Sequence, residues 1–205
     1  MIGAVQSLPV EGGPVGILLC AGFGRRFGGD KLLAPLADGT PVAVASARTL
    51  VAALGRAVAV LRPGQQALQS ALAHTGIEVL VSAAAVDGMG AALAAAVQAH
   101  AQAPGWVVAL GDMPCVAEAT VRQVAAALAQ DSALAAPFHQ GSRGHPVGFG
   151  RQWGPELARL AGDEGARALL RQQADRLIPV AVDDPGCLLD VDTPQDLARL
   201  PRLGR

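Results

Sequence analysis

The chain has 205 residues, 51% of them hydrophobic, and its formal net charge at pH 7 is −1. This length is enough to bury the core of one α/β domain but hardly of two, and the apolar share excludes general disorder. The balanced charge leaves no basic field to hold nucleic acid, and no apolar run reaches the length of a membrane span.

Residues 1–14 are rich in Gly and Pro near their end, and we expect them to form a flexible lead-in to a domain of residues 15–205. The first residues lack a charged n-region and a clean cleavage site, so we expect no secretory signal. Cys20, Cys115 and Cys187 are odd in number and far apart, which is typical of free thiols and not of a disulfide framework or a zinc site. These features predict a protein of the reducing cytoplasm.

A glycine-rich loop follows the first predicted strand, residues 15–21. From Ala21 the sequence runs Ala-Gly-Phe-Gly-Arg-Arg-Phe-Gly-Gly-Asp-Lys and ends on Lys31, the only lysine of the chain. Glycine lets backbone N–H groups turn inward and approach an anion closely. A lysine offers a compact point charge where an arginine offers a planar fork. The loop is therefore predicted to hold a phosphate.

Two familiar phosphate loops do not fit this segment. The Walker pattern needs a lysine directly after its second glycine, but here Asp30 precedes Lys31. Leu32 also stands where that pattern needs a Ser or Thr for a metal. The dinucleotide fingerprint G-x-G-x-x-G begins at Gly22 but has Phe27 at the position of its third glycine. Both departures argue against those families.

Predicted helices and strands alternate after the loop. In chain order they are a helix over 42–54 opened by Pro41, a strand over 57–61, a helix over 65–74 and a strand over 77–81. This alternation predicts a parallel sheet with helices on both faces. A second loop, Asp87-Gly88-Met89-Gly90, then precedes an Ala-rich helix over 91–101. In one interpretation this loop only caps the helix, through Asp87 or Gly88. In the other it also holds a ligand, because a helix N-terminus attracts anions.

A buried strand over 106–110 is predicted to place Asp112 at its carboxyl end, within the run Gly-Asp-Met-Pro. In open α/β sheets this edge is where ligands bind. Carboxylate oxygens suit hard cations, and Mg²⁺ on NTP phosphates needs only one or two protein carboxylates. Asp112 is therefore a candidate metal ligand. The alternative is that it caps the helix that follows Ala117 and covers 121–130.

The elements predicted next are a strand over 133–137, a turn over 140–144, a returning strand over 145–149, helices over 153–161 and 165–174, and a strand over 177–182. We expect Asp163 and Glu164 to start the second of these helices, where the helix dipole favours carboxylates. His145 follows the turn within the run Arg-Gly-His-Pro, and a lone histidine is more often structural than functional.

Two carboxylates precede the last predicted helix, residues 195–200. Thr193 can cap this helix and Pro194 can open it, but neither residue explains the carboxylates before them. Because Asp190 and Asp192 are two residues apart, they point the same way on an extended segment. Both are therefore candidate site residues.

Taken together, these segments resemble the MobA-like NTP transferases, the nucleotidyltransferases of the molybdenum-cofactor type. From Ala21 to Lys31 the pattern Ala-Gly-x-Gly-x-Arg-x-Gly-x-x-Lys resembles the loop that wraps the triphosphate in that family. The other matching motifs, in the family's order, are the loop at Gly88, Gly-Asp-Met-Pro at Asp112, Arg-Gly-His-Pro at His145 and Asp-x-Asp-Thr-Pro at Asp192. The resemblance extends over almost the whole chain and favours the molybdenum cofactor cytidylyltransferases.

The resemblance implies a role for each matching residue. The implied nucleotide-binding residues are Ala21, Gly22, Gly24, Arg25, Arg26, Lys31, Gly88 and Gly90. The implied catalytic residues are Arg26, Lys31 and Asp112, and the implied Mg²⁺ ligands are Asp112 and Asp192, with Asp190 as the substitute. The implied acceptor contacts are Arg143, Gly144, His145 and Pro146. Ala92 stands where many relatives have Ser, and Arg167 lies in a run that relatives often carry near the site.

The resemblance also implies the fold and the reaction. The fold is a Rossmann-like, three-layer α/β/α domain with a mostly parallel sheet, as in nucleotide-diphospho-sugar transferases. The reaction moves a nucleoside monophosphate from an NTP to a phosphate monoester and releases pyrophosphate. Ala21-Gly22, in place of the Gly-Gly of guanylyltransferase relatives, favours CTP, with molybdopterin or the molybdenum cofactor as acceptor. A molybdoenzyme or its chaperone is a candidate protein partner.

Three other interpretations stay open. A GTP- or sugar-phosphate-specific nucleotidyltransferase would use the same phosphate chemistry. A non-catalytic nucleotide-binding protein, which the change at Ala92 favours, would bind NTP and Mg²⁺ but release no pyrophosphate. A nicotinamide-dependent oxidoreductase rests only on the strand followed by Gly-x-Gly, and it leaves Lys31 and Asp112 without a role.

Overall fold

One mixed sheet organises the computed structural model, which describes residues 12–22, 26–163 and 165–200. Its strands are β1 (Val15–Leu19), β2 (Ala57–Leu61), β3 (Glu78–Val81), β4 (Gly105–Leu110), β5 (Leu134–His139), β6 (Ser142–Arg143), β7 (Val147–Gly150) and β8 (Ile178–Ala181). Their order across the sheet is β3-β2-β1-β4-β7-β5-β6, and β8 pairs with β5. The predicted lead-in, residues 1–14, falls mostly outside the described residues.

The sheet is parallel from β3 to β4, and β7 then returns antiparallel between β4 and β5. The reversal begins at Gln140 and Gly141, whose φ angles of 49° and 81° make a tight turn between β5 and β6. β8 runs parallel to β5. The predicted mostly parallel sheet is therefore confirmed, with two antiparallel strands, β6 and β7, where the sequence predicted one returning strand.

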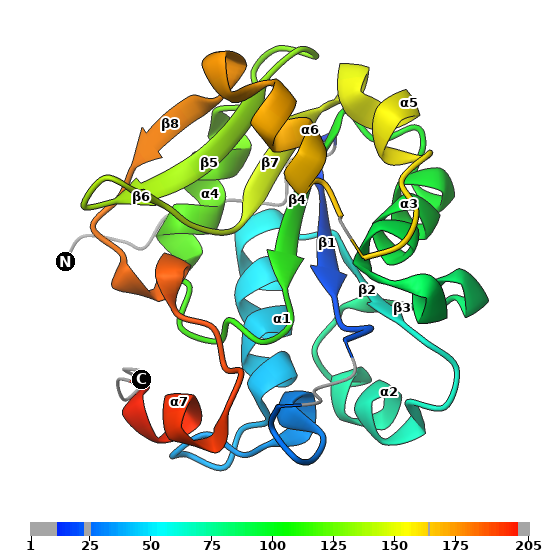
Figure 1. The fold of residues 1–205 in the computed structure, drawn as a ribbon, viewed down its shortest axis with the longest axis vertical. Coiled ribbons are helices and arrows are strands. Elements are labelled where there is room, and N and C mark those ends of the chain that lie inside the picture. The colour runs from blue at the N-terminus through cyan, green and yellow to red at the C-terminus, as the bar shows by residue number, and fades with distance from the viewer. Residues whose placement is uncertain (1–11, 23–25, 164, 201–205) are drawn as a thin grey trace, which may run out of the picture.

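Helices cover both faces of this sheet (Figure 1). They are α1 (Val42–Leu54), α2 (Gln66–Leu72), α3 (Met89–Ala99), α4 (Glu118–Ala126), α5 (Gly154–Leu157), α6 (Arg167–Gln172) and α7 (Pro194–Arg199). Successive strand side chains point to opposite faces. Ile17 therefore packs in the core with α3, α5 and α6, while Leu18 packs with α1, α2 and α4. This is the predicted three-layer α/β/α domain, and none of its described helices is long and apolar enough to cross a membrane.

The helices after β7 are shorter than predicted. The segments expected to be helical over 153–161 and 165–174 form only α5, α6 and two 3₁₀ turns, Arg151–Trp153 and Ala174–Arg176. Between the two segments the Gly162 carbonyl accepts from the Gly90 N–H at 2.7 Å, and this long-range contact holds residues 161–163 outside either helix. Asp163 consequently lies four residues before α6 and does not start it.

The last helix, α7, fixes the acidic segment before it. Thr193 caps α7 in a capping box with Asp196, and Pro194 is the first helical residue, as predicted. Val191 is fully buried in a small cluster that also contains Val42 of α1. The chain around Val191 is thereby held against the body of the domain, beside the end of β4 (Figure 1).

Candidate functional site

A cleft opens at the carboxyl ends of β1 and β4, where the strand order changes direction and open α/β sheets bind ligands. It contains about 1590 Å³ of empty space, part of it open to solvent. The predicted site residues that line it are Ala21, Gly22, Arg26, Lys31, Gly88, Asp112 and Asp192. Gly24 and Arg25 lie outside the described residues.

Lys31 lies between two carboxylates that are distant in sequence. Its Nζ donates to Asp112 Oδ2 at 2.6 Å and to Asp192 Oδ1 at 2.8 Å. Asp30 positions it by accepting from the Leu32 N–H, which caps the 3₁₀ helix Lys31–Leu33. Burial alone would lower the pKa of the Lys31 ammonium, but the two carboxylates outweigh burial and raise that pKa. Lys31 is thus a permanent positive charge at the centre of the site.

Asp112 is positioned by backbone bonds at the end of β4. The Gly111 N–H donates to the Leu19 carbonyl at 3.0 Å, and the Asp112 carbonyl accepts from the Val191 N–H at 2.9 Å. Asp112 Oδ1 is buried and has no hydrogen-bond partner among the described residues. Burying a carboxylate oxygen without a hydrogen-bond partner costs free energy, so Asp112 Oδ1 is a candidate to bind a ligand.

Capping does not explain Asp112, because a different carboxylate serves the start of α4. Asp184, which follows β8, accepts from the Ala117 N–H at 2.9 Å and from the Thr120 hydroxyl at 2.6 Å. The capping alternative considered for Asp112 is therefore wrong.

Asp190 and Asp192 both line the cleft, as expected for residues two apart on an extended segment. The hydrogen bond from Lys31, together with the charge of Arg26, lowers the pKa of Asp192. Burial, together with the charges of Asp112 and Asp192, raises the pKa of Asp190. Lys31 therefore pairs with Asp112 and Asp192, while Asp190 has the repulsion of both carboxylates and the higher pKa.

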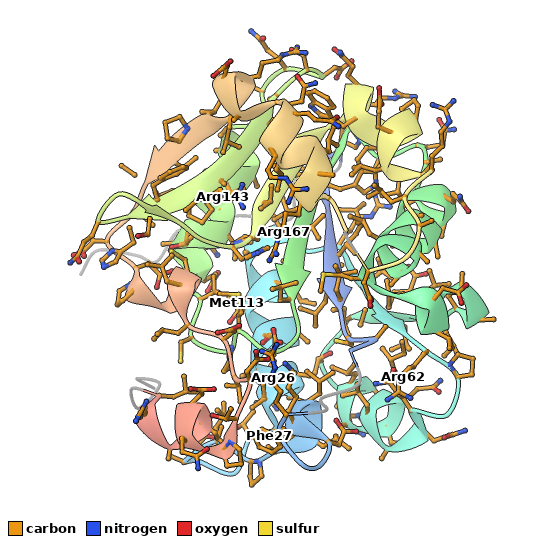
Figure 2. The ribbon with its side chains drawn as sticks, viewed as in Figure 1. Arg26, Phe27, Arg62, Met113, Arg143 and Arg167 are labelled. Carbon is orange, nitrogen blue, oxygen red and sulfur yellow. The ribbon has the colours of Figure 1, made fainter. Side chains whose placement is uncertain are left out.

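Arg26 lies at the rim of the cleft with its side chain 80% exposed. Its Nη1 donates to Asp192 Oδ2 at 2.9 Å. An exposed ion pair of this kind contributes little to stability, so the guanidinium can exchange Asp192 for a ligand anion at small cost. Figure 2 shows Arg26 below the strand ends and Arg167, the first residue of α6, above them. Arg167 also lines the cleft.

The second loop approaches the segment 161–163 closely at both of its glycines. Gly88, at φ +131°, lines the cleft, and a Cβ on it would collide with the Asp163 carboxylate. A Cβ on Gly90 would lie 2.8 Å from the Ala161 carbonyl oxygen. Gly90 itself is buried and does not line the cleft. Gly88 is the N-cap residue of α3, so the predicted cap is confirmed at Gly88, although no side chain caps this helix.

Three residues that were not predicted as site residues, Val86, Met89 and Asp163, also line the cleft. Met89 was predicted only as part of the second loop, and Asp163 only as part of a helix start. Val86 and Met89 are 48% and 44% exposed, which is high for large apolar side chains. Met89 could have been found from its place between the two loop glycines. Asp163 could have been found from its place in the run before Arg167 that relatives often carry near the site, whereas Val86 carries no such signal. Ala92, the position that lacks the expected Ser, is buried on the cleft wall.

The run Arg143–Pro146 passes from β6 to β7 beside the cleft and does not line it. Arg143 is exposed, while Pro146 is buried and Gly144 lies against the Cys187 carbonyl. The Nδ1 atom of His145 is buried and has no hydrogen-bond partner among the described residues. Burial, aided by the charges of Arg143 and Arg167, lowers the pKa of His145 to about 4, although the charge of Asp112 acts the other way. His145 is therefore a neutral imidazole close to two arginines and to Asp112.

The cysteines are free thiols, as expected. Cys20 is fully buried at the end of β1, and burial, together with the charges of Asp112 and Asp30, raises its pKa well above the usual range. A thiol that stays protonated is a poor nucleophile, so Cys20 packs under the site and does not react in it.

Comparison with known proteins gives one family. A family model described as the MobA-like NTP transferase domain matches residues 16–177. Among curated proteins, nicotine blue oxidoreductase of Paenarthrobacter nicotinovorans is 31% identical over 193 residues, which cover 90% of this chain and 95% of that protein.

Solved structures share the fold. The crystal structure of Rv0371c from Mycobacterium tuberculosis H37Rv matches with a TM-score of 0.76 and 33% identity, over 91% of this chain and 96% of that one. The complex of Rv0371c with manganese matches with a TM-score of 0.75 and 31% identity over the same shares. Molybdopterin-guanine dinucleotide biosynthesis protein A from Archaeoglobus fulgidus matches with a TM-score of 0.60 and 20% identity, over 90% of this chain and 95% of that one, which is a likeness of fold.

Proposed function

We propose a specific reaction for this chain, which belongs to the MobA-like NTP transferase family and is thus a nucleotidyltransferase. It would move CMP from CTP to the phosphate monoester of molybdopterin or the molybdenum cofactor and release pyrophosphate. One observation carries the proposal. Lys31 joins Asp112 and Asp192 at the carboxyl ends of β1 and β4, directly after a glycine-rich loop. This combination suits phosphoryl transfer, which asks the protein chiefly for positioning and for charge.

The triphosphate would lie along Gly22, Arg26 and Lys31. A Cβ on Gly22 would meet none of the described atoms within 4 Å, so packing does not require glycine there. A phosphate approaching the backbone would require it. The exposed apolar side chains of Val86 and Met89, on the cleft wall, would cover one face of the base.

Mg²⁺ is part of the proposal, and a relative's crystal structure in complex with manganese supports a divalent metal in this family. The chain's donors fit the ion, because the unpartnered Asp112 Oδ1 is a hard oxygen ligand. Within the described residues no group of three or more His, Cys, Asp or Glu is arranged as a metal site. Mg²⁺ does not need one, because it keeps waters and phosphate oxygens as its other ligands. Asp112 and Asp192 would hold it, and when bound it would neutralise charge on the phosphate oxygens.

The transfer would proceed by direct attack. An acceptor phosphate oxygen would form a bond to the α-phosphorus while the bond to the β-phosphate oxygen breaks, and pyrophosphate would leave with that electron pair. Lys31 and Arg26 would neutralise the departing pyrophosphate. No general base is needed, because the acceptor phosphate is already ionised. Arg143 and Arg167, whose charges reach His145 next to the cleft, would hold the acceptor.

The test of the mechanism is the substitution Asp112→Asn in a pyrophosphate-release assay with Mg²⁺, CTP and molybdopterin. We expect a loss of about a hundredfold or more in kcat, as for removal of a group that acts on transition-state charge. The control is Asp183→Asn, which changes a fully exposed carboxylate outside the cleft and should leave the rate unchanged. Normal turnover by a folded Asp112→Asn variant would refute the mechanism.

The nucleotide and acceptor are tested by comparing CTP, GTP, ATP and UTP, each with molybdopterin and with sugar phosphates. Preference for CTP would support the role given to Ala21-Gly22, and preference for GTP would refute it. Tight NTP binding without pyrophosphate release from any pair would point to a non-catalytic nucleotide-binding protein. A cytoplasmic location and a molybdoenzyme or its chaperone as recipient belong to the same proposal, and the free cysteines support the former.

An oxidoreductase is the second candidate, and the 31% identity to nicotine blue oxidoreductase supports it. The charged group of Lys31, Asp112 and Asp192 favours the transferase, because it matches the charge of a leaving pyrophosphate and no hydride transfer requires it. Titration with NADH and NADPH separates the two. Binding of either cofactor without NTP-dependent pyrophosphate release would favour the oxidoreductase.

A further inference from the structure

A buried glutamine completes the hydrogen bonding at the end of β1. Gln65 follows β2, just before α2, and is 8% exposed. Its Nε2 donates to the Cys20 carbonyl at 3.0 Å, and its Oε1 accepts from the Arg62 N–H at 2.8 Å. A backbone N–H can only donate and a carbonyl can only accept, so these two partners fix the orientation of the amide.

The contact falls where the β1–β2 ladder stops. The last backbone bond between these strands runs from the Cys20 N–H to the Val60 carbonyl at 3.1 Å. The next acceptor along β1 is the carbonyl of Cys20, and the Gln65 side chain takes the place of a strand there. Ala21 and Gly22, which line the cleft, follow immediately. This hydrogen bond therefore holds the backbone at the point where Ala21 and Gly22 leave the sheet.

We propose that Gln65 is a positioning residue: it holds the Cys20 carbonyl and thereby sets the path of Ala21 and Gly22, where the glycine-rich segment begins. The inference rests on the proposed function for its ligand, an NTP triphosphate. Gln65 itself does not line the cleft and touches no reacting group. Removing its amide leaves the Cys20 carbonyl buried without a partner, and the loop can then turn to find one.

The experiment uses Gln65→Met, which keeps the length of the side chain and removes both hydrogen bonds, and Gln65→Glu, which keeps the acceptor and loses the donor. The matched control is Gln98→Met. Gln98 also donates through Nε2 to a backbone carbonyl, that of Ala158 at 2.8 Å, but it lies on the surface of α3 outside the cleft. Calorimetry measures binding of each NTP with Mg²⁺, and hydrogen exchange measures the amides of Cys20 to Gly22 without ligand.

We expect both Gln65 variants, folded by circular dichroism, to bind the preferred NTP about tenfold more weakly, as for an orphaned buried acceptor. Their amides at Cys20 to Gly22 should exchange faster than in the wild type. Gln98→Met should change neither quantity. If Gln65→Met binds NTP as the control does, the inference is overturned.

The two proposals can fail separately. If the wild-type protein binds no NTP, the proposed function fails, and the exchange measurement alone then decides whether Gln65 orders the end of β1. Unchanged exchange in Gln65→Met would overturn the inference in that case too. Weaker NTP binding with faster exchange in both variants would support both proposals.

Discussion

At the scale of single residues, Lys31 has two possible sets of anionic partners, which are the carboxylates of Asp112 and Asp192 and the phosphate oxygens of a nucleotide. In the structure it neutralises Asp112 and Asp192, both within 2.8 Å of its Nζ. In the proposed complex it would contact phosphate oxygens, and the two carboxylates would contact Mg²⁺. Unit charges about 4 Å apart attract by about 4 kcal/mol at an effective dielectric constant of about 20. If the proposed metal site is right, Lys31 would therefore compete with a metal ion for the same oxygens when no nucleotide is bound.

Lys31→Met tests this competition. Without the ammonium, the two carboxylates have lost a cation, and we expect Mn²⁺ to bind about tenfold more tightly in the absence of nucleotide. NTP should bind more weakly at the same time, because the triphosphate has lost its partner. Titration of free Mn²⁺ by electron paramagnetic resonance measures the first effect, and calorimetry measures the second.

The control for Lys31→Met is Arg56→Met. Arg56 is an exposed positive charge just before β2, at the amino-terminal end of that strand and thus away from the cleft at the carboxyl ends. This substitution should alter neither affinity. Weaker or unchanged Mn²⁺ binding by Lys31→Met would contradict the competition and leave Lys31 as a purely structural cation.

At the scale of elements, Asp184 connects the chain after β8 to α4. It is 7% exposed, and its carboxylate accepts from Ala117, Thr120 and its near neighbour Gly186, with distances of 2.9, 2.6 and 2.9 Å. No other side chain caps α4 in the described part of the chain. The contact also fixes the start of the segment that leads to Asp190 and Asp192. Asp184 is therefore a structural carboxylate that a search for acidic site residues could mistake for a ligand.

Asp184→Ala leaves three donors without their acceptor, and we expect it to lower the free energy of unfolding by about 3 kcal/mol. Thr120→Val removes only one of the donors and should lower it by about 1 kcal/mol. Urea unfolding measures both. As a control, Asp175→Ala changes an exposed carboxylate in a 3₁₀ turn and should stay within about 0.5 kcal/mol of the wild type. Equal stability of the two aspartate variants would show that Asp184 does not tie these elements together.

At the scale of the whole molecule, the cleft is assembled from five separate segments. The ends of β1 and β4 supply the loop and Asp112, the chain before α7 supplies Asp192, and the contact between the second loop and residues 161–163 supplies the far wall. Each segment is held by bonds of its own to the sheet or to a helix. His145 is buried beside this cleft, and because burial lowers its pKa, its ionisation affects the stability of the domain.

The pH dependence of unfolding follows from His145. Its pKa is about 4 in the folded protein and about 6.5 for an ordinary histidine. Between these values the unfolded chain binds a proton that the folded chain does not bind, so stability falls as pH falls. Over this window the contribution of His145 is about 3 kcal/mol, lost at pH 4 and present above pH 6.5.

Urea unfolding of the wild type and of His145→Gln over this pH range isolates the effect. The variant lacks the titrating group, so the difference in unfolding free energy between the two proteins should change in favour of the wild type as pH rises. A difference that is independent of pH would show that His145 titrates normally in the fold.

Much of the fold could be predicted because its signals are local. The apolar strand runs, the Thr-Pro start of the last helix and the alternation of elements depend on neighbours in sequence, and α1 and β2 have the predicted bounds. The helices after β7 were predicted too long, and the contact of the Gly162 carbonyl with the Gly90 N–H between them could not be predicted. Hydrophobic periodicity contains no information about such a contact.

The sequence by itself determined the family, the layered fold and which residues carry charge beside a glycine-rich loop, since these follow from residue type and spacing. Only the tertiary structure decided which of them meet. It brought Asp112 and Asp192 to one ammonium, moved Asp163 from a helix start to the cleft, and assigned the start of α4 to Asp184. The physical reason is that electrostatic and hydrogen-bond partners are chosen by distance in space, which folding sets and which separation along the chain does not reveal.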